Sequence, residues 1–353
     1  MLGRPIETDP QSNAQIHLLS EDDRPSDNIY GEQPYGDHTG RWIAIRHHST
    51  NARTGGISIT DLADGTRRDV FAGDPRFPAF HAWGEYLYYQ QAVDGKLMLR
   101  RCRYDTTEVE DISVLPSEMG TFSYGTVSPD HRYYAVCVME NTVGPSKVHL
   151  LCIQTGQWRL LLDKPGYHAK HEQFSRDGMN HVLIQLNHQP HAEQVLLGEL
   201  TIDGEERLFP ADQPHTARPT GHETWIGTSD RILFSSRDPE KRGNMWSARV
   251  KDDRPVPVRC QAKQYCHVSV SHCGRYWIGD VISEEGIPIY IGRFGSGTCR
   301  RLALSHTVHD GKQWSHTHPY LTADNKWLIF NSNRNGHAQV FGAALSPGWI
   351  EEL

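Results

Sequence analysis

A short unit recurs seven times along this chain of 353 residues: a small polar turn followed by an aromatic or aliphatic run. The copies are HTGRWIAI from His38, AWGEYLYY from Ala82, SPDHRYYAV from Ser128, SRDGMNHVLI from Ser175, TSDRILF from Thr228, SHCGRYWIG from Ser271 and TADNKWLIF from Thr322. Successive starts lie roughly 43 to 53 residues apart, which is the length of one four-stranded propeller blade. The sequence therefore predicts an all-β fold, a single seven-bladed β-propeller over residues 1–353, in preference to an irregular β-sandwich.

The last copy lacks residues for a complete blade. After the strand-like segment QVFGAAL from Gln339, only SPGWIEEL remains. The segment AQIHLLS from Ala14 has strand character and can supply the missing strand. We therefore expect the N-terminal segment to pair with the last blade, which would remove an open sheet edge.

Composition excludes several classes of partner. The net charge is −7 and no basic stripe is present, so a nucleic acid is not an expected partner. No run of about 18 apolar residues exists to span a membrane, and the first residues do not have the pattern of a signal peptide. The seven cysteines are scattered without a CxxC pair, which is typical of reduced thiols. We expect a cytoplasmic protein that uses neither a membrane nor a nucleic acid.

Histidines recur just before the turns. Four residues before the Ser or Thr of a turn, the sequence has Tyr124, His171, His267 and His318, while His222 is slightly shifted and His81 lies nearby. In a propeller the strand before the turn is the innermost one, so these side chains converge on one mouth of the channel. A lone histidine there is usually a hydrogen-bonded core residue, but several from separate blades indicate a site, because imidazole is the commonest metal ligand.

The seventh copy has the densest cluster. His316 and His318 are two residues apart, so on a strand they point to the same side. Gln313 precedes them and can add an amide oxygen, and His267 from the sixth blade can complete the set. Three nitrogens and one oxygen, with no thiolate, suit Mn, Fe, Co, Ni or Zn.

At these residues the sequence resembles the oligogalacturonate lyases, the propeller family of pectate lyases. The motifs are QWSHTHPYLTADNKWLIFNSNRNG, HEQFSRDG at His171, GHETW at Gly221 and HVSVSHCGRYWIGD at His267, and the likeness covers roughly residues 35 to 345. The resemblance implies manganese bound by His267, Gln313, His316 and His318, with His222 at the substrate site. It also implies β-elimination of a uronate-containing oligosaccharide, with the metal polarising the carboxylate.

One departure concerns the base that removes the C5 proton. The resemblance implies an arginine on the fourth blade, but no arginine lies between Arg176 and Arg207, and Val195 or a neighbour falls where it is expected. The candidates for this base are His188, His191, His222 and Lys170. We expect a histidine, because imidazole titrates nearest to neutral pH.

Four further residues are candidate substrate contacts: His171, Arg218, Tyr124 and His81. Arg218 is included because a guanidinium can bind a carboxylate with two hydrogen bonds.

Three functions remain open from the sequence: a metal-dependent lyase acting on short acidic oligosaccharides, a different metal-dependent carbohydrate enzyme, and a non-catalytic binding propeller. A binding scaffold would have no reason to place metal-type ligands on adjacent blades. Because propellers have many activities, the fold alone does not decide among them.

Overall fold

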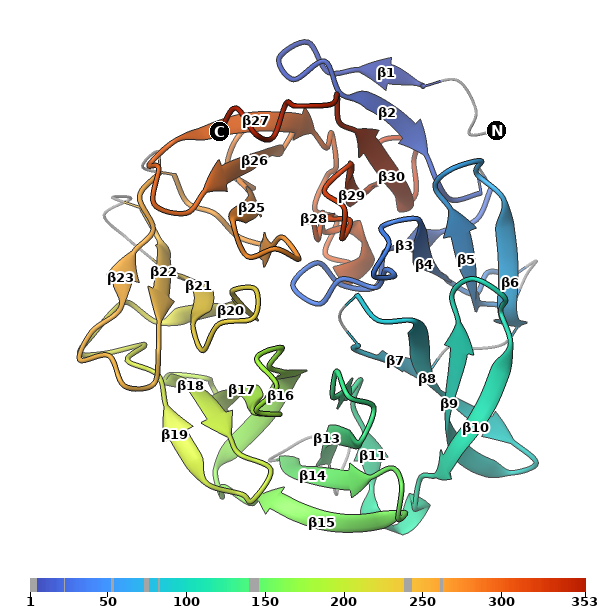
Figure 1. Ribbon diagram of the computed structural model, residues 1–353, viewed down its shortest axis with the longest axis vertical. Helices are drawn as coiled ribbons and strands as arrows, with labels where there is room; N and C mark the ends of the chain where they lie inside the picture. Colours follow the sequence, from blue (N-terminus) through green and yellow to red (C-terminus); the bar gives the residue numbers. More distant parts are fainter. Residues whose placement is uncertain are drawn as a thin grey trace.

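Seven antiparallel sheets form a ring around a common centre (Figure 1). The structure is a computed structural model that describes residues 5–21, 23–51, 54–72, 76–81, 83–139, 146–237, 243–260 and 263–353. Each sheet is one blade, and the chain visits the blades in order around the ring. The seven-bladed β-propeller predicted from the repeats is confirmed.

The first three blades contain the following strands. Blade 1 has β3 (Ser26–Asp27), β4 (Trp42–His47), β5 (Gly56–Asp61) and β6 (Arg67–Ala72). Blade 2 has β7 (Arg76–Ala79), β8 (Tyr86–Val93), β9 (Lys96–Arg103) and β10 (Val109–Val114). Blade 3 has β11 (Thr121–Phe122), β12 (Thr126–Val127), β13 (Tyr133–Met139), β14 (Ser146–Cys152) and β15 (Gln157–Leu162).

The next three blades each have four strands. Blade 4 has β16 (Tyr167–Phe174), β17 (Val182–His188), β18 (Val195–Leu200) and β19 (Glu206–Leu208). Blade 5 has β20 (Pro219–Trp225), β21 (Ile232–Ser236), β22 (Met245–Ala248) and β23 (Val256–Pro257). Blade 6 has β24 (Val268–Val270), β25 (Tyr276–Asp280), β26 (Pro288–Arg293) and β27 (Cys299–Leu304).

Blade 7 combines the two ends of the chain. It contains β28 (Tyr320–Leu321), β29 (Trp327–Ser332) and β30 (Gln339–Ala344), followed by β2 (Gln15–Leu18) and β1 (Glu7–Thr8). β2 pairs antiparallel with β30, with Ile16 opposite Ala343, and Figure 1 shows the N-terminal strands on the outside of this blade. Ile16 is fully buried between blades 6 and 7. The N-terminal strand thus covers the edge that β30 would otherwise expose.

Polar turns connect the first and second strands of the blades. Ser128 bonds to Asp130, Ser175 to Asp177 and Thr322 to Asp324 through their hydroxyls at 2.6 to 2.8 Å. These side chains satisfy the turn backbone locally. The aromatic and aliphatic run that follows each turn becomes the second strand, whose side chains fill the clusters between neighbouring blades.

The connection between β3 and β4 crosses the centre of the ring. We call residues 28–36 the crossing loop; in Figure 1 this blue segment projects inward from β3. Asn28 Nδ2 donates to the His318 carbonyl at 2.7 Å, and Gln33 Nε2 donates to the Glu172 carbonyl at 3.0 Å. Because these partners belong to blades 7 and 4, the loop is hydrogen-bonded to opposite sides of the ring.

Helices are short in the described residues: η1 (Ser117–Met119) and η2 (Gln313–Ser315) are both 3₁₀ turns. No helix in this part of the chain has the length and apolar character needed to cross a bilayer.

Candidate metal centre and pocket

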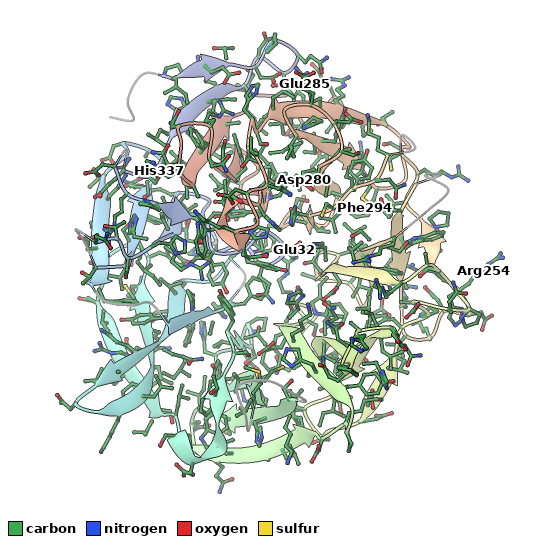
Figure 2. The ribbon with its side chains drawn as sticks, turned by 180° about the vertical axis from the view of Figure 1, so that it is seen from behind. Glu32, Arg254, Asp280, Glu285, Phe294 and His337 are labelled. Carbon is green, nitrogen blue, oxygen red and sulfur yellow. The ribbon has the colours of Figure 1, made fainter. Side chains whose placement is uncertain are left out.

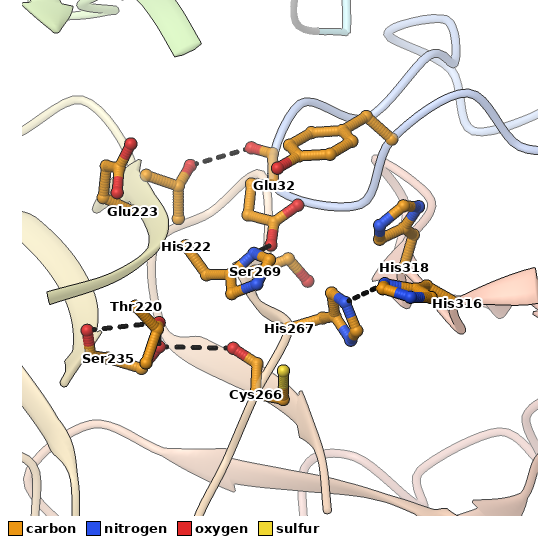
Figure 3. A network of polar contacts seen from close by, with 12 residues as sticks. Glu32, Thr220, His222, Glu223, Ser235, Cys266, His267, Ser269, His316 and His318 are labelled. Atoms are coloured by element: carbon orange, nitrogen blue, oxygen red, sulfur yellow. Dashed lines mark hydrogen bonds and ion pairs between the residues drawn. The ribbon is translucent and has the colours of Figure 1, made fainter. Parts of the chain in front are cut away.

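Three imidazoles meet at the centre of the ring. His267 directly precedes β24, and His316 and His318 lie between η2 and β28. Their ligand atoms all lie within 4.8 Å of one another, and His267 Nε2 is 3.1 Å from His316 Nδ1 (Figure 3). Gln313, on η2, places its side-chain amide 3.3 Å from His318 Nε2. The four residues predicted as metal ligands are therefore adjacent. We call this group, which consists of His267, Gln313, His316 and His318, the histidine position.

A buried carboxylate fixes the orientation of His267. Asp280, on β25, accepts hydrogen bonds from the Nδ1 and the backbone N–H of His267, both at 2.8 Å, and from the hydroxyl of Thr317. Burial alone would raise the pKa of Asp280, but the adjacent His267 lowers it to about 2. His267 therefore presents Nε2 to the cluster, and a carboxylate behind a histidine in this way is the usual support of a metal-binding imidazole.

The other two imidazoles are neutral. Burial lowers the pKa of His316 to about 4 and that of His318 well below its usual value, and the neighbouring His267 acts in the same direction. His318 Nδ1 is buried and has no hydrogen-bond partner among the described residues. Neutral nitrogens offer their lone pairs to a cation.

This donor set fits a divalent transition metal. Two imidazole nitrogens bound to one ion at 2.0–2.1 Å and at right angles lie about 3 Å apart, close to the separation of the His267 and His316 nitrogens. Nitrogen and amide oxygen donors suit Mn²⁺, Co²⁺ or Zn²⁺. The buried Nδ1 of His318, which has no partner among the described residues, would be available to such an ion.

A second group of possible metal ligands also contains His267. The ligand atoms of His222, Cys266 and His267 lie within 4.8 Å of one another. A bulge in β20 between Pro219 and Glu223 interrupts the pairing with β21 and allows His222 to reach inward. Its Nδ1 bonds to Glu32 of the crossing loop, and although burial alone would lower the pKa of His222, Glu32 raises it to about 9. Figure 2 shows Glu32 near the middle of the molecule.

A pocket of about 460 Å³ opens beside the histidine position. Its walls come from the crossing loop and from blades 1, 3, 4, 5 and 7. The lining includes Tyr30, Arg46, Tyr124, Lys170, His171, His222, Gln313 and His316. The structure thus brings Tyr124, Lys170, His171 and His222 together with two of the predicted metal ligands, in a space of the size typical of small-molecule sites.

Lys170, on β16, is an unpaired cation in this pocket. Among the described residues its ammonium has no hydrogen-bond or ion-pair partner. Burial lowers the pKa of Lys170, and the charge of Glu223 only partly offsets this. A larger fraction of this amine is therefore neutral than for an exposed lysine.

A tyrosine, a histidine and a glutamate form a chain along the same wall. The Tyr30 hydroxyl lies 3.3 Å from His171 Nε2, and His171 Nδ1 lies 3.3 Å from Glu223 Oε1. Sequence reasoning found His171 but missed Tyr30, because the crossing loop belongs to none of the seven repeats.

The guanidinium in the pocket belongs to Arg46. It bonds to Asp27 through two nitrogens, the shorter contact being 2.7 Å, and to the Tyr124 hydroxyl at 2.7 Å. The predicted arginine, Arg218, instead donates to the carbonyl of Ala192 at 2.7 Å and does not line the pocket. Arg46 lies on the second strand of its blade, whereas the repeated histidine pattern that predicted the site lies before the turns.

Three other predicted site residues lie elsewhere. His188 and His191 are exposed at the connection between β17 and β18, and neither lines the pocket. His81 is buried 4.5 Å from the ring of His131 and bonds to the Val127 carbonyl, and burial lowers its pKa to about 3. Because His81 directly precedes its turn, it lies at the turn end of the inner strand, away from the pocket.

Comparison with known proteins supports the fold class. No protein-family model and no curated protein sequence matches the chain. A solved oligogalacturonate lyase in complex with manganese is 18% identical, with a TM-score of 0.77 over 98% of this chain and 96% of that one. An oligogalacturonate lyase from Vibrio parahaemolyticus is 15% identical, with a TM-score of 0.75 over 97% and 96%.

A more distant propeller is less similar. The propeller domain of the Trilobed protease from Pyrococcus furiosus is 12% identical, with a TM-score of 0.54 over 86% of this chain and 92% of that domain. The resemblance to oligogalacturonate lyases inferred from sequence motifs is therefore confirmed at the level of the fold.

Proposed function

We propose that this protein is a metal-dependent lyase that cleaves short uronate-containing, pectin-type oligosaccharides by β-elimination. The observation that carries the proposal is the meeting of His267, Gln313, His316 and His318 beside a pocket. These are the residues that the sequence resemblance assigns to manganese. The likeness in fold to a solved oligogalacturonate lyase with manganese supports the proposal of a metal-dependent lyase.

The bound ion would act as a Lewis acid for the uronate carboxylate, which makes the neighbouring C5 proton more acidic. Asp280 keeps His267 oriented for this task, and the crossing loop holds the backbone of His318 through Asn28. The pocket walls restrict the sugar to one orientation, which lowers the entropic part of the barrier.

Lys170 is the base in this proposal. It lines the pocket, has no partner among the described residues, and has a lowered pKa. His222 is less suited, because its Nδ1 is bonded to Glu32 and its ring packs 4.5 Å from that of His267. His188 and His191 do not line the pocket, so we propose Lys170 as the base in place of the expected histidine.

Tyr30 is the proton donor to the leaving group. Its hydroxyl lies in the pocket next to His171. In the reaction the C5–H bond breaks and the proton passes to Lys170 Nζ. The electron pair forms the C4–C5 double bond, the C4–O bond breaks, and the leaving oxygen takes the Tyr30 proton. Lys170 then releases its extra proton to solvent, and the Tyr30 phenolate takes one up, which restores the enzyme.

We also place the protein in the cytoplasm. All seven cysteines are free thiols, as expected for a reducing compartment.

The test uses the full-length protein with Mn²⁺ and a panel of short uronate oligosaccharides, followed by the ultraviolet absorbance of the unsaturated product. We expect product from at least one galacturonate oligomer and none after metal chelation. Lys170→Met should lower kcat by about 10² to 10⁴. The control, Lys164→Met, removes a lysine of the same blade that is paired with Glu206 and should retain activity. Metal binding without unsaturated product from any uronide would overturn the lyase proposal and favour a different metal-dependent carbohydrate enzyme.

A further inference from the structure

Cys266 brings a sulfur atom to the metal centre. It directly precedes His267 in the chain, and its Sγ lies within 4.8 Å of the ligand nitrogens of His222 and His267. Figure 3 shows the sulfur of Cys266 on the side of its backbone that faces the rings of His222 and His267. The other cysteines have no part in this cluster, and Cys273, on the turn of the same blade, is exposed.

The backbone of Cys266 is fixed from two sides. Its N–H donates to the Asp280 carbonyl at 3.0 Å, and its carbonyl accepts from the Ser235 hydroxyl at 3.2 Å. Ser235 is in turn bonded to Thr220, which lies on the bulged part of β20 beside His222. The thiol is therefore positioned by the packing of blade 5 against blade 6.

Both histidines of this cluster have a carboxylate behind them. His267 Nδ1 donates to Asp280, and His222 Nδ1 donates to Glu32. Each therefore turns its Nε2 away from the carboxylate, and the two rings meet edge to face with centroids 4.5 Å apart. A carboxylate–histidine pair of this kind orients the ring and raises the basicity of the free nitrogen.

The two groups cannot hold two ions at once. His267 has only one free nitrogen, since its Nδ1 is bound to Asp280, and both groups include His267. The histidine position offers nitrogen and amide oxygen, whereas the cluster at Cys266 offers two nitrogens and a thiolate. A thiolate favours ions such as Zn²⁺ and Co²⁺, whereas the histidine position has no thiolate and an amide oxygen, a donor that suits Mn²⁺.

We propose that His222, Cys266 and His267 form a second ion position, the thiol position, which takes Zn²⁺ or Co²⁺ as an alternative to the histidine position. Binding there releases the Cys266 proton to solvent and forms a sulfur–metal bond. The inference rests on the metal centre of the proposed function, but not on lyase chemistry.

The experiment is a titration of the full-length, metal-free protein with Co²⁺, followed by absorption spectroscopy. A thiolate ligand produces a sulfur-to-cobalt charge-transfer band in the near ultraviolet, separate from the weaker visible bands of bound Co²⁺. We expect this band in the native protein and in Cys273→Ser, which removes the exposed thiol of the same blade. Cys266→Ser should lose the band and keep the visible bands, because the histidine position remains.

A second pair of variants separates the two positions by affinity. Glu32→Gln removes the partner of His222 alone, so it should weaken Zn²⁺ binding by about 10- to 100-fold and leave Mn²⁺ affinity unchanged. Asp280→Asn removes the partner of the shared His267 and should weaken both ions. Equal loss of Zn²⁺ and Mn²⁺ affinity in Glu32→Gln would overturn the proposal.

The outcomes also distinguish this inference from the proposed function. Bound Co²⁺ without a charge-transfer band in the native protein, or a band that survives in Cys266→Ser, would overturn the thiol position while the histidine position stands. Failure of any divalent ion to bind would remove the metal centre, and with it both proposals.

Discussion

In the crossing loop, Gly31 packs against the backbone of His318, which belongs to the histidine position. Substitution of Gly31 therefore tests whether the loop positions this ligand. A Cβ at Gly31 would lie 2.5 Å from the carbonyl carbon, 2.7 Å from the carbonyl oxygen and 2.9 Å from the Cα of His318. Gly31 does not have a left-handed φ, so the effect of alanine is steric alone. Since ordinary contact begins at 3.4 Å, the loop or His318 must move by roughly 0.9 Å, more than the ~0.5 Å tolerance of a metal or catalytic site.

Gly31→Ala should therefore weaken the metal centre without unfolding the protein. Overpacking of this kind costs about 1–3 kcal/mol, a part of the 5–15 kcal/mol typical of a folded domain. Mn²⁺ affinity, measured from the paramagnetic resonance of the free ion, should fall by about 10- to 100-fold, as for loss of a group that supports a ligand.

The matched control is Gly36→Ala in the same loop. There a Cβ would meet the Trp42 carbonyl oxygen at 3.3 Å and Ile43 Cγ2 at 3.6 Å, and the φ is again not left-handed. This variant should bind Mn²⁺ as the native protein does. Native Mn²⁺ affinity in Gly31→Ala would show that the crossing loop does not position His318.

Three further predictions follow from the pocket, the ligands and the ring closure. A base must be neutral to accept a proton, so kcat should fall as the pH drops through the pKa of Lys170, which burial lowers. If the residual activity of Lys170→Met shows the same fall of kcat at low pH, Lys170 is not the base. His316→Ala should strongly lower metal content while thermal unfolding stays close to native, because strand pairing rather than the ion closes the ring; undiminished metal content, measured by elemental analysis, would contradict the histidine position. Deletion of residues 1–20 removes β1 and β2 and exposes the edge of β30, so it should promote aggregation in light scattering; a monodisperse, equally stable truncation would count against the role of this closure.

The blades could be predicted from the sequence because their physical signal is local. A polar turn such as that of Ser175 and Asp177 satisfies its own backbone, and the strand that follows is rich in residues suited to a buried sheet. The adjacency of His267 to His316 follows from the same repeats, because consecutive copies become neighbouring blades. Local patterns of this kind need no knowledge of distant contacts.

The remainder of the site depends on contacts remote in sequence. Glu32 is 190 positions from His222, and Gln33 is 139 positions from Glu172. In the part of the chain that the structure describes, no other blade has a loop like the crossing loop between its first two strands, so no periodicity predicts that Tyr30 enters the pocket. His81 shows the opposite error: proximity to a turn predicted a site residue, but its position at the end of the strand places it outside the pocket.

In the proposed function, the histidine position is the metal centre of a lyase. The most direct test measures the initial rate of unsaturated-product formation from a short oligogalacturonate while Mn²⁺ is titrated into the chelated, full-length protein. We expect no product without metal, a rate that rises until about one ion is bound per chain, as for a single shared centre, and no recovery in His318→Ala. A rate independent of bound Mn²⁺, or full activity in His318→Ala, would contradict the proposed function.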